Sequence, residues 1–238
     1  MLGALALLCF ASSSPTALRA ERVQLELILA VDASLSVSDE EFALQLQGLA
    51  KAFRNETVVA AIRASGDHGV AVMLLQWSDR AQQAVSVDWT LVRDTGSASV
   101  FAQLVARAPR AYDGAGTAIG RALETSIPLF QSNGFEGDRR VIDLSGDGID
   151  NRGPLPARMR DIAVASGIVV NGLAILNEDR YLDLYYEKNV IGGTGAFVVT
   201  AADYEDFAAA IVRKLIREIS DQPLAQRPGR PSVASAER

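Results

Sequence analysis

The stretch Val23-Gln-Leu-Glu-Leu-Ile-Leu-Ala-Val31-Asp32-Ala-Ser34-Leu-Ser36 joins an apolar run to an acidic, hydroxyl-rich segment. The run begins with alternating residues and becomes continuously apolar, which is typical of a central parallel strand buried on both faces. Asp32, Ser34 and Ser36 then place three oxygen-bearing side chains at the carboxyl end of that strand. Open α/β sheets bind ligands at this end, and hard cations bind to oxygen. The stretch therefore predicts a site for a divalent cation.

A helix is expected directly after this loop. Ser38 and Glu41 have the spacing of a capping box, in which each side chain accepts a hydrogen bond from the other residue's backbone. Apolar residues then repeat at helical spacing: Phe42, Leu46, Leu49, Ala50 and Phe53. The Asp32 loop is therefore predicted to connect a strand to a helix.

The rest of the chain continues to alternate strands with helices. Further strands are expected at 70–77, 84–89, 140–144, 168–176 and 196–200. Further helices are expected at 99–108, from the glycine-rich loop 112–120 to about 131, at 156–166, and after a capping Asp203. In that last helix, Arg213, Lys214 and Arg217 suit the C-terminal half, where the helix dipole favours cations. This order predicts a doubly wound, mostly parallel α/β sheet with helices on both faces, and the 70–77/84–89 hairpin supplies one antiparallel edge strand.

Composition indicates one acidic domain between two terminal segments. The chain has 238 residues, 49% hydrophobic content and a net charge of -6, which suits one domain at 21–220 and argues against a nucleic-acid surface. Residues 1–20 resemble a signal peptide, and residues 221–238 resemble a disordered tail. We therefore expect a periplasmic or secreted protein without a membrane span. Cys9, the only cysteine, lies in the expected signal, so the processed protein has no disulfide.

Two more loops carry oxygen ligands. They are Gly116-Thr117 and Gly146-Asp147-Gly148, and the topology brings both to the same sheet edge as the Asp32 loop. Together the three loops offer two carboxylates and three hydroxyls, a set that fits Mg²⁺. Neutral hydroxyls leave the charge of the cation uncancelled, so such a site can recruit a carboxylate from another molecule.

This pattern of Asp-x-Ser-x-Ser, a later Gly-Thr and a still later Asp-Gly resembles the metal-ion-dependent adhesion site of von Willebrand factor type A domains. The resemblance spans about 23–219. The segments 139–147 (Arg-Arg-Val-Ile-Asp-Leu-Ser-Gly-Asp) and 170–173 (Val-Asn-Gly-Leu) are similar to a bacterial exported branch whose function is uncharacterised.

The resemblance implies a role for each ligand. Ser34, Ser36 and Thr117 bind the cation through their hydroxyls, whereas Asp32 and Asp147 often act through water. The cation is Mg²⁺, with Mn²⁺ or Ca²⁺ as alternatives, and an acidic residue of a protein partner completes its coordination. The family usually has Thr-Asp-Gly in the third loop, where this chain has Gly146-Asp147-Gly148. The resemblance thus implies binding and no catalysis, and it does not indicate an oligomeric state.

Other interpretations remain open for the first and third loops. Asp and Ser after a strand can simply cap a helix. A haloacid-dehalogenase-type phosphatase also uses an Asp after the first strand and a late Gly-Asp-Gly loop to hold Mg²⁺. That chemistry needs an acid two residues after the nucleophile, where this chain has Ser34. A cation that only stabilises the fold is a third possibility.

Two further motifs argue against other enzymes. Gly114-x-Gly116-x-x-x-Gly120 resembles a dinucleotide-binding loop, but a helix is expected before it, whereas such a loop follows a strand. His68 is the only histidine and lies in a polar turn, which argues against a serine hydrolase and a histidine zinc site.

Two features have no assigned role. Asp143 lies in an apolar strand and needs a partner if it is buried, either beside the metal site or in a separate polar pocket. Tyr181, Tyr185 and Tyr186 have helical spacing, and we expect them on a packed surface helix.

Overall fold

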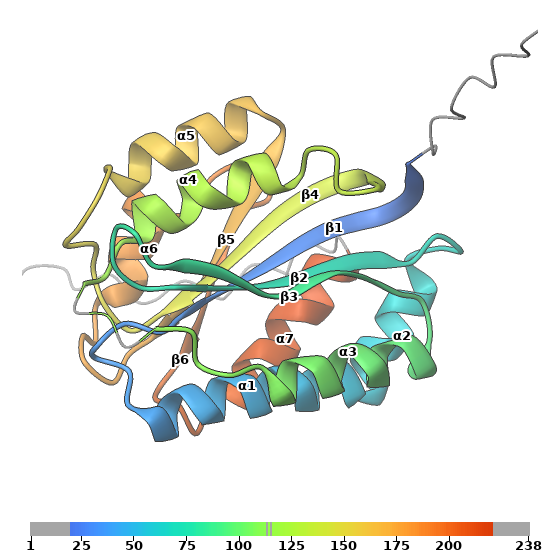
Figure 1. The fold of residues 1–238 in the computed structure, drawn as a ribbon, viewed down its shortest axis with the longest axis horizontal. Helices are drawn as coiled ribbons and strands as arrows, with labels where there is room; N and C mark the ends of the chain where they lie inside the picture. The colour runs from blue at the N-terminus through green and yellow to red at the C-terminus, as the bar shows by residue number, and fades with distance from the viewer. Residues whose placement is uncertain (1–19, 113, 115, 221–238) are drawn as a thin grey trace, which may run out of the picture.

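The computed structural model describes residues 20–112, 114 and 116–220. The expected signal segment 1–20, apart from its last residue, and the expected tail 221–238 lie outside the described residues. The described part forms one six-stranded sheet with helices on both faces (Figure 1). The strands are β1 (Glu21–Asp32), β2 (Val70–Trp77), β3 (Gln83–Val92), β4 (Phe135–Gly146), β5 (Ile168–Ile175) and β6 (Val198–Ala201). The helices are α1 (Asp39–Arg54), α2 (Glu56–Ala64), α3 (Thr95–Arg107), α4 (Ile119–Leu129), α5 (Pro156–Ala165), α6 (Leu182–Asn189) and α7 (Phe207–Ser220).

The strand order is β3-β2-β1-β4-β5-β6, and only the β2–β3 pair is antiparallel. This confirms the predicted doubly wound sheet with one antiparallel edge strand. The carboxyl end of β1 lies between its neighbours, because Asp32 is in register with Trp77 of β2 and Val31 with Ser145 of β4. The loops that follow β1 and β4 therefore meet at one edge, on the left of Figure 1.

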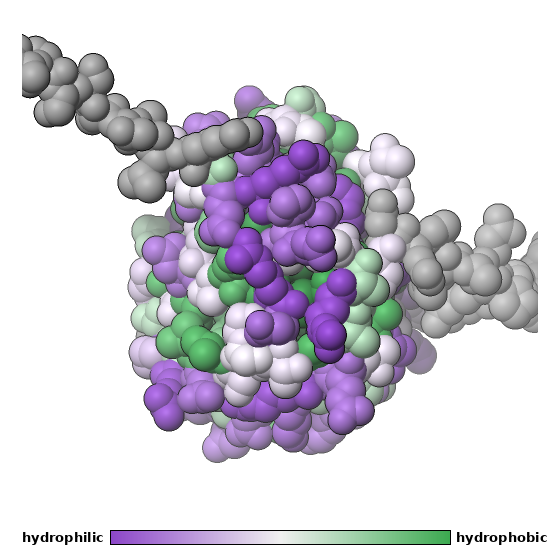
Figure 2. All heavy atoms as spheres, turned by 90° about the vertical axis from the view of Figure 1, so that its right-hand side faces the viewer, coloured by the Kyte–Doolittle hydropathy of each residue, from purple (hydrophilic) through white to green (hydrophobic). Residues whose placement is uncertain are grey.

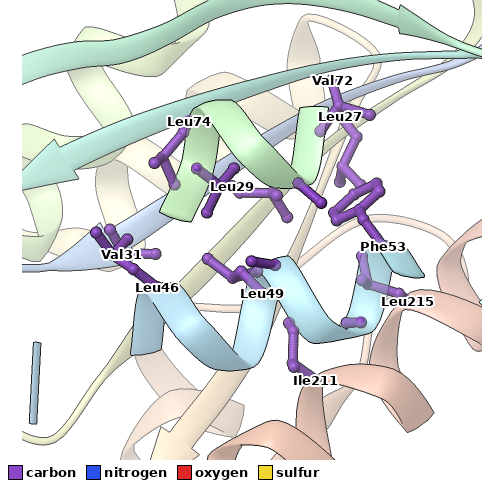
Figure 3. Close-up of a cluster of buried hydrophobic side chains, with 14 of the residues drawn as sticks. Leu27, Leu29, Val31, Leu46, Leu49, Phe53, Val72, Leu74, Ile211 and Leu215 are labelled. Carbon is purple, nitrogen blue, oxygen red and sulfur yellow. The ribbon is translucent and has the colours of Figure 1, made fainter. Parts of the chain in front are cut away.

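Alternate residues of β1 face two separate cores. Leu27, Leu29 and Val31 pack against α1, α2, α3 and α7, whereas Ile28 and Ala30 pack against α4, α5 and α6. Figure 3 shows the first core, in which side chains from β1 and β2 meet those of α1 and α7. Each fully buried leucine contributes roughly 1.5–3 kcal/mol through the hydrophobic effect. The two cores hold the central strands firmly, so the loops at their carboxyl ends have a fixed base.

The structure differs from the sequence predictions at two helices. Helix α2 was not predicted; the Asn55 side chain caps it by accepting hydrogen bonds from the backbone of Thr57 and Val58. The predicted cap of the last helix was wrong, because α7 begins at Phe207 and Asp203 accepts from Asp206 N in the turn before it. Within the described residues, each helix is too short or too polar to cross a bilayer.

One basic residue of α7, Lys214, differs in role from the prediction, whereas Arg217 lies in the last turn as expected. Lys214 is fully buried, and its Nζ lies 2.7 Å from Asp143 Oδ1 in β4 and also contacts Glu218. It is therefore an internal counter-ion and does not serve the helix dipole. The same contact answers the question about Asp143, which is buried and paired beneath α7, away from the loops at the carboxyl edge.

Candidate metal centre

The first loop buries the side chains of Asp32 and Ser34 and leaves Ser36 exposed. Asp32 is completely buried at the end of β1, and its Oδ1 accepts a hydrogen bond of 2.7 Å from Ser34 N. This contact closes a tight turn of the kind that Asp forms with its own backbone. Ser34 is also buried, and its Oγ lies 3.2 Å from Ser36 Oγ, whereas Leu35 between them is 67% exposed. The loop therefore collects three oxygen ligands on one side.

Asp147 joins this group from β4. Its Oδ1 accepts a hydrogen bond of 2.8 Å from Ser36 Oγ, and its Oδ2 accepts one of 3.1 Å from Tyr204 OH. Asp147 is buried, whereas Ile149, two residues later, is 50% exposed. Side-chain and backbone contacts thus link Asp32, both serines and Asp147 in one continuous series that runs from the end of β1 to the end of β4.

Thr117 comes from the second loop and lies against the third. Its backbone N donates to Asn151 Oδ1 at 3.0 Å, and its backbone O accepts from Asn151 N at 2.9 Å. A Cβ on Gly148 would lie 3.8 Å from Thr117 Oγ1. Ser34 and Gly114 form an isolated parallel bridge, which ties the second loop to the first. All five expected ligands therefore lie at one sheet edge, and their binding of a metal stays a prediction.

Electrostatics at the two carboxyls favours a bound cation or proton. Burial, and then the negative charge of Asp147, raises the pKa of Asp32 to about 7. Burial also raises the pKa of Asp147, although hydrogen bonds from Ser36 and Tyr204 oppose that shift. Two buried carboxylates that raise each other's energy are stabilised when a positive charge binds between them.

The donor set fits a hard divalent ion. Asp32 Oδ2 is buried, and the part of the chain that the structure describes supplies no hydrogen-bond partner for it. The five residues offer hydroxyl and carboxylate oxygens, the ligands that Mg²⁺ prefers. Across residues 20–112, 114 and 116–220, no three His, Cys, Asp or Glu side chains gather in a group suited to a metal. A cation at this edge would thus need the hydroxyls of Ser34, Ser36 and Thr117 as ligands.

Arg110 holds the first loop and was missed by the sequence analysis. Its Nη2 donates to the backbone oxygens of Ala33, Ser34 and Val37 at 3.2, 3.0 and 2.7 Å. Its Nη1 forms an ion pair of 2.7 Å with Asp39. No local pattern marks this residue, because it lies in a connecting segment far along the chain from the loop that it holds.

Two more residues hold Asp32 and Asp147, one through the backbone and one through the carboxylate. Gln45 Nε2 donates to the backbone oxygen of Asp32 at 3.0 Å, and Tyr204 bonds Asp147. Gln45 is a polar residue three positions after Phe42 on the buried face of α1, so its position gave a signal. Tyr204 had none, because it lies in the turn before α7.

The glycine-rich loop serves close packing. A Cβ on Gly120 would lie 1.8 Å from the backbone oxygen of Pro154, so only glycine allows α4 to approach the segment before α5. Helix α3 is the element before this loop, as expected. The loop therefore lacks the strand that a dinucleotide-binding loop follows.

A cavity of about 350 Å³ lies toward the other end of the sheet. Its lining includes Arg139, Val169, Phe197, Arg217 and Glu218, which belong to β4, β5, the segment before β6, and α7. Figure 2 views the molecule from the side on which β1 begins, where hydrophilic side chains surround hydrophobic atoms. The cavity does not include the candidate ligands.

Comparisons with known proteins support the same fold. A family model described as "Protein of unknown function (DUF1194)" matches residues 22–223, and no curated protein matches the chain. Proximal thread matrix protein 1 of the mussel byssus, in a structure with a zinc-occupied MIDAS motif, matches with TM-score 0.60 and 16% identity, covering 83% of this chain and 48% of that one. The vWF domain of the type V pili tip protein Mfa5 from Porphyromonas gingivalis matches with TM-score 0.59 and 12% identity, covering 86% and 98%. A von Willebrand factor type A protein from Catenulispora acidiphila matches with TM-score 0.57 and 16% identity, covering 83% and 43%. The chain spans about half the length of the first solved structures that it matches.

Proposed function

This chain belongs to the DUF1194 family and has the fold of von Willebrand factor type A domains, and we propose that it binds a protein partner through a divalent cation. The proposed ligands are Asp32, Ser34, Ser36, Thr117 and Asp147. The observation that carries the proposal is the chain of contacts that joins the Asp32 loop to Asp147, with an unpartnered buried oxygen on Asp32.

Each group has a distinct part in this proposal. The hydroxyls of Ser34, Ser36 and Thr117 ligate the ion without neutralising it, and the two carboxylates fix its position and supply negative charge. Arg110 and Gln45 hold the backbone of the first loop in place. A cation bound there supplies an electrophilic position that a carboxylate of another molecule can occupy.

The proposal is binding and not catalysis. Asp32, the residue that a phosphatase would use as nucleophile, is completely buried. Ser34 is two residues later, where that chemistry needs a carboxylic acid, and a serine cannot protonate a leaving group at neutral pH.

Mg²⁺ is the proposed ion, because it commonly takes one or two carboxylates and completes its coordination with neutral oxygen ligands and water. The zinc-occupied motif in the mussel protein makes Zn²⁺ a necessary comparison, alongside Mn²⁺ and Ca²⁺. We also propose export, supported by the expected signal segment 1–20 and by the likeness to a domain of a pilus tip protein.

Thermal melting with each of these four ions tests the metal site. An ion at about a hundredfold over its dissociation constant should add about 2.7 kcal/mol to the free energy of unfolding. Asp32→Ala and Ser34→Ala should abolish this gain, whereas Asp67→Ala and Ser99→Ala, outside the site, should keep it. If none of the four ions raises the melting temperature, the proposed metal site is wrong.

Partner capture from a periplasmic extract separates adhesion from a structural role. The protein is immobilised and exposed to the extract with Mg²⁺ or with a chelator, and Asp32→Ala serves as the matched variant. Capture that needs Mg²⁺ and Asp32 supports adhesion, whereas capture that ignores the chelator leaves the metal a structural role. Phosphatase turnover lost in Asp32→Ala would replace the proposal with an enzyme.

A further inference from the structure

Three buried polar atoms gather on the inner side of Asp32. They are Asp32 Oδ2, Tyr186 OH and Trp77 Nε1, and within the described residues none of them has a hydrogen-bond partner. Buried polar groups are nearly always satisfied, and an unsatisfied one destabilises a protein. One of these three atoms is an acceptor and the other two can donate, so their needs are complementary.

Gly146 makes this approach possible. A Cβ at position 146 would lie 2.9 Å from Asp32 Oδ2 and 2.9 Å from Tyr186 OH, so these two oxygens are at most twice that distance apart. The same Cβ would lie 3.1 Å from Trp77 Cζ2. Any larger residue at position 146 would push between the tyrosine and the carboxylate. The lack of a side chain at this position therefore opens the space for the phenol.

The surroundings hold these side chains firmly. Asp32 and Trp77 are register partners on β1 and β2, and Gly146 ends the other neighbour of β1. The Tyr186 ring projects from α6 across the sheet, where a Cβ on Gly172 of β5 would lie 2.6 Å from its Cδ1. Asp32, Trp77 and Tyr186 are all completely buried. The hydroxyl of Tyr186 is therefore held close to the Asp32 carboxylate.

We propose that Tyr186 is a positioning residue for the metal centre, with its hydroxyl donating to Asp32 Oδ2 directly or through one water. Asp32 Oδ1 is already held by Ser34 N, so a second donor on Oδ2 fixes the rotation of the carboxylate. Tyr204 holds Asp147 in the same manner, at 3.1 Å. Each carboxylate of the centre thus has its own tyrosine. This inference rests on the proposed metal binding.

Titration of Tyr186→Phe with Mg²⁺ is the first test. Loss of a hydrogen bond that orients a ligand typically weakens metal affinity 10- to 100-fold, so we expect a rise of about tenfold in the dissociation constant. The melting temperature of the metal-free variant should fall slightly, since the buried Asp32 Oδ2 loses its donor. Tyr181→Phe, at an exposed position of the same segment, should match the original protein in both respects. Unchanged Mg²⁺ affinity in Tyr186→Phe would overturn the role.

A second measurement needs no metal and separates this inference from the proposed function. The ¹³Cζ resonances of labelled tyrosines are recorded in metal-free protein, with Tyr186 assigned from the Tyr186→Phe variant. Asp32→Asn should shift the Tyr186 resonance, and Asp147→Asn should chiefly shift that of Tyr204. A Tyr186 resonance that ignores Asp32→Asn would refute the contact, whatever the protein does with Mg²⁺. If Asp32→Asn shifts the Tyr186 resonance but the protein binds no cation, the contact between Tyr186 and Asp32 is supported and the proposed metal binding is wrong.

Discussion

Lys214 of α7 places its Nζ 2.7 Å from Asp143 Oδ1 of β4, and both side chains are almost completely buried. Glu218, one turn further along α7, shares the same ammonium group. Three ionisable groups thus lie between the last helix and the centre of the sheet. Their interaction links α7 to β4.

Removal of the shared cation should destabilise the protein strongly. Lys214→Met leaves the carboxyls of Asp143 and Glu218 buried without a counter-ion, and breaking a buried pair in this way typically costs about 3–5 kcal/mol. Urea denaturation of the variant measures the loss. Lys188→Met, at an exposed position of α6, is the matched control and should change stability by less than about 0.5 kcal/mol. A loss equal to that of the control would show that the buried group contributes nothing.

The metal-free protein should become less stable as the pH rises from 5 to 8. Burial, and then the nearby charge of Glu218, raises the pKa of Asp143 from 3.8 to about 8, although Lys214 opposes the shift. The folded state then keeps a proton that the unfolded chain has released, so stability is lost as the pH rises toward the folded pKa. We expect a fall of about 1 to 3 kcal/mol between these two pH values. Urea denaturation with a chelator measures it, and Asp143→Asn should reduce the dependence to the part that Asp32, with its pKa of about 7, contributes.

Asp32→Asn should stabilise the metal-free protein and abolish its response to Mg²⁺. The amide has nearly the same shape but carries no charge, so the repulsion between Asp32 and Asp147 disappears. Without metal, we expect the free energy of unfolding to rise by roughly 1 kcal/mol, which is about the free energy that corresponds to one pKa unit. Melting curves with a chelator and with Mg²⁺ check both effects. A variant that is less stable than the original under both conditions would contradict the electrostatic account of the centre.

Arg110→Ala should loosen the first loop. The three backbone oxygens that Arg110 Nη2 contacts lose their donor. A hydrogen bond to a charged group typically contributes about 1.5–3 kcal/mol to stability. Stability should fall by about that amount, and Mg²⁺ should bind more weakly because Ser34 is no longer held. Denaturation and calorimetric titration measure the two losses. Arg107→Ala, exposed at the end of α3, should show neither.

Gly120→Ala should be one of the most damaging small substitutions in the fold. The added methyl group would overlap the Pro154 oxygen, a backbone atom that cannot move without shifting the start of α5. We expect a loss of about 2 kcal/mol or more from such overpacking. Gly96→Ala is the control, since its nearest neighbour would be at 3.4 Å and alanine favours the helix there. Equal stability of both variants would show that α4 and the Pro154 segment can separate.

Local sequence features predicted the elements that carry their own signals. The Ser38–Glu41 capping box forms as expected, and the apolar run before Asp32 is the central strand β1. Helix α2 was missed because it has only nine residues, and its start depends on the side chain of Asn55. Nine residues complete fewer than three helical turns, so the apolar repeat of this helix is too brief to stand out from a loop.

The candidate site was predictable where its residues follow strands, as Asp32 and Asp147 do, and where the family pattern marks a residue, as at Thr117. Asp32 and Asp147 end adjacent strands, so a parallel topology was enough to bring them together. Arg110 and Tyr204 reach the same edge from segments with no regular structure, and their direction depends on the complete tertiary fold. Lys214 and Glu218 gave a signal that was overlooked, since both lie on the otherwise apolar inner face of α7.

The first and third loops each place an exposed apolar residue close to a buried candidate ligand, and this has a consequence for evolution. Ser34 and Asp147 are buried, whereas Leu35 and Ile149, beside or near them in sequence, extend into solvent. Mutations at the outward positions leave the oxygen ligands and their supports unchanged. If the proposed binding holds, descendants of this chain can therefore change its specificity by altering Leu35 or Ile149 while inheriting the same inner framework.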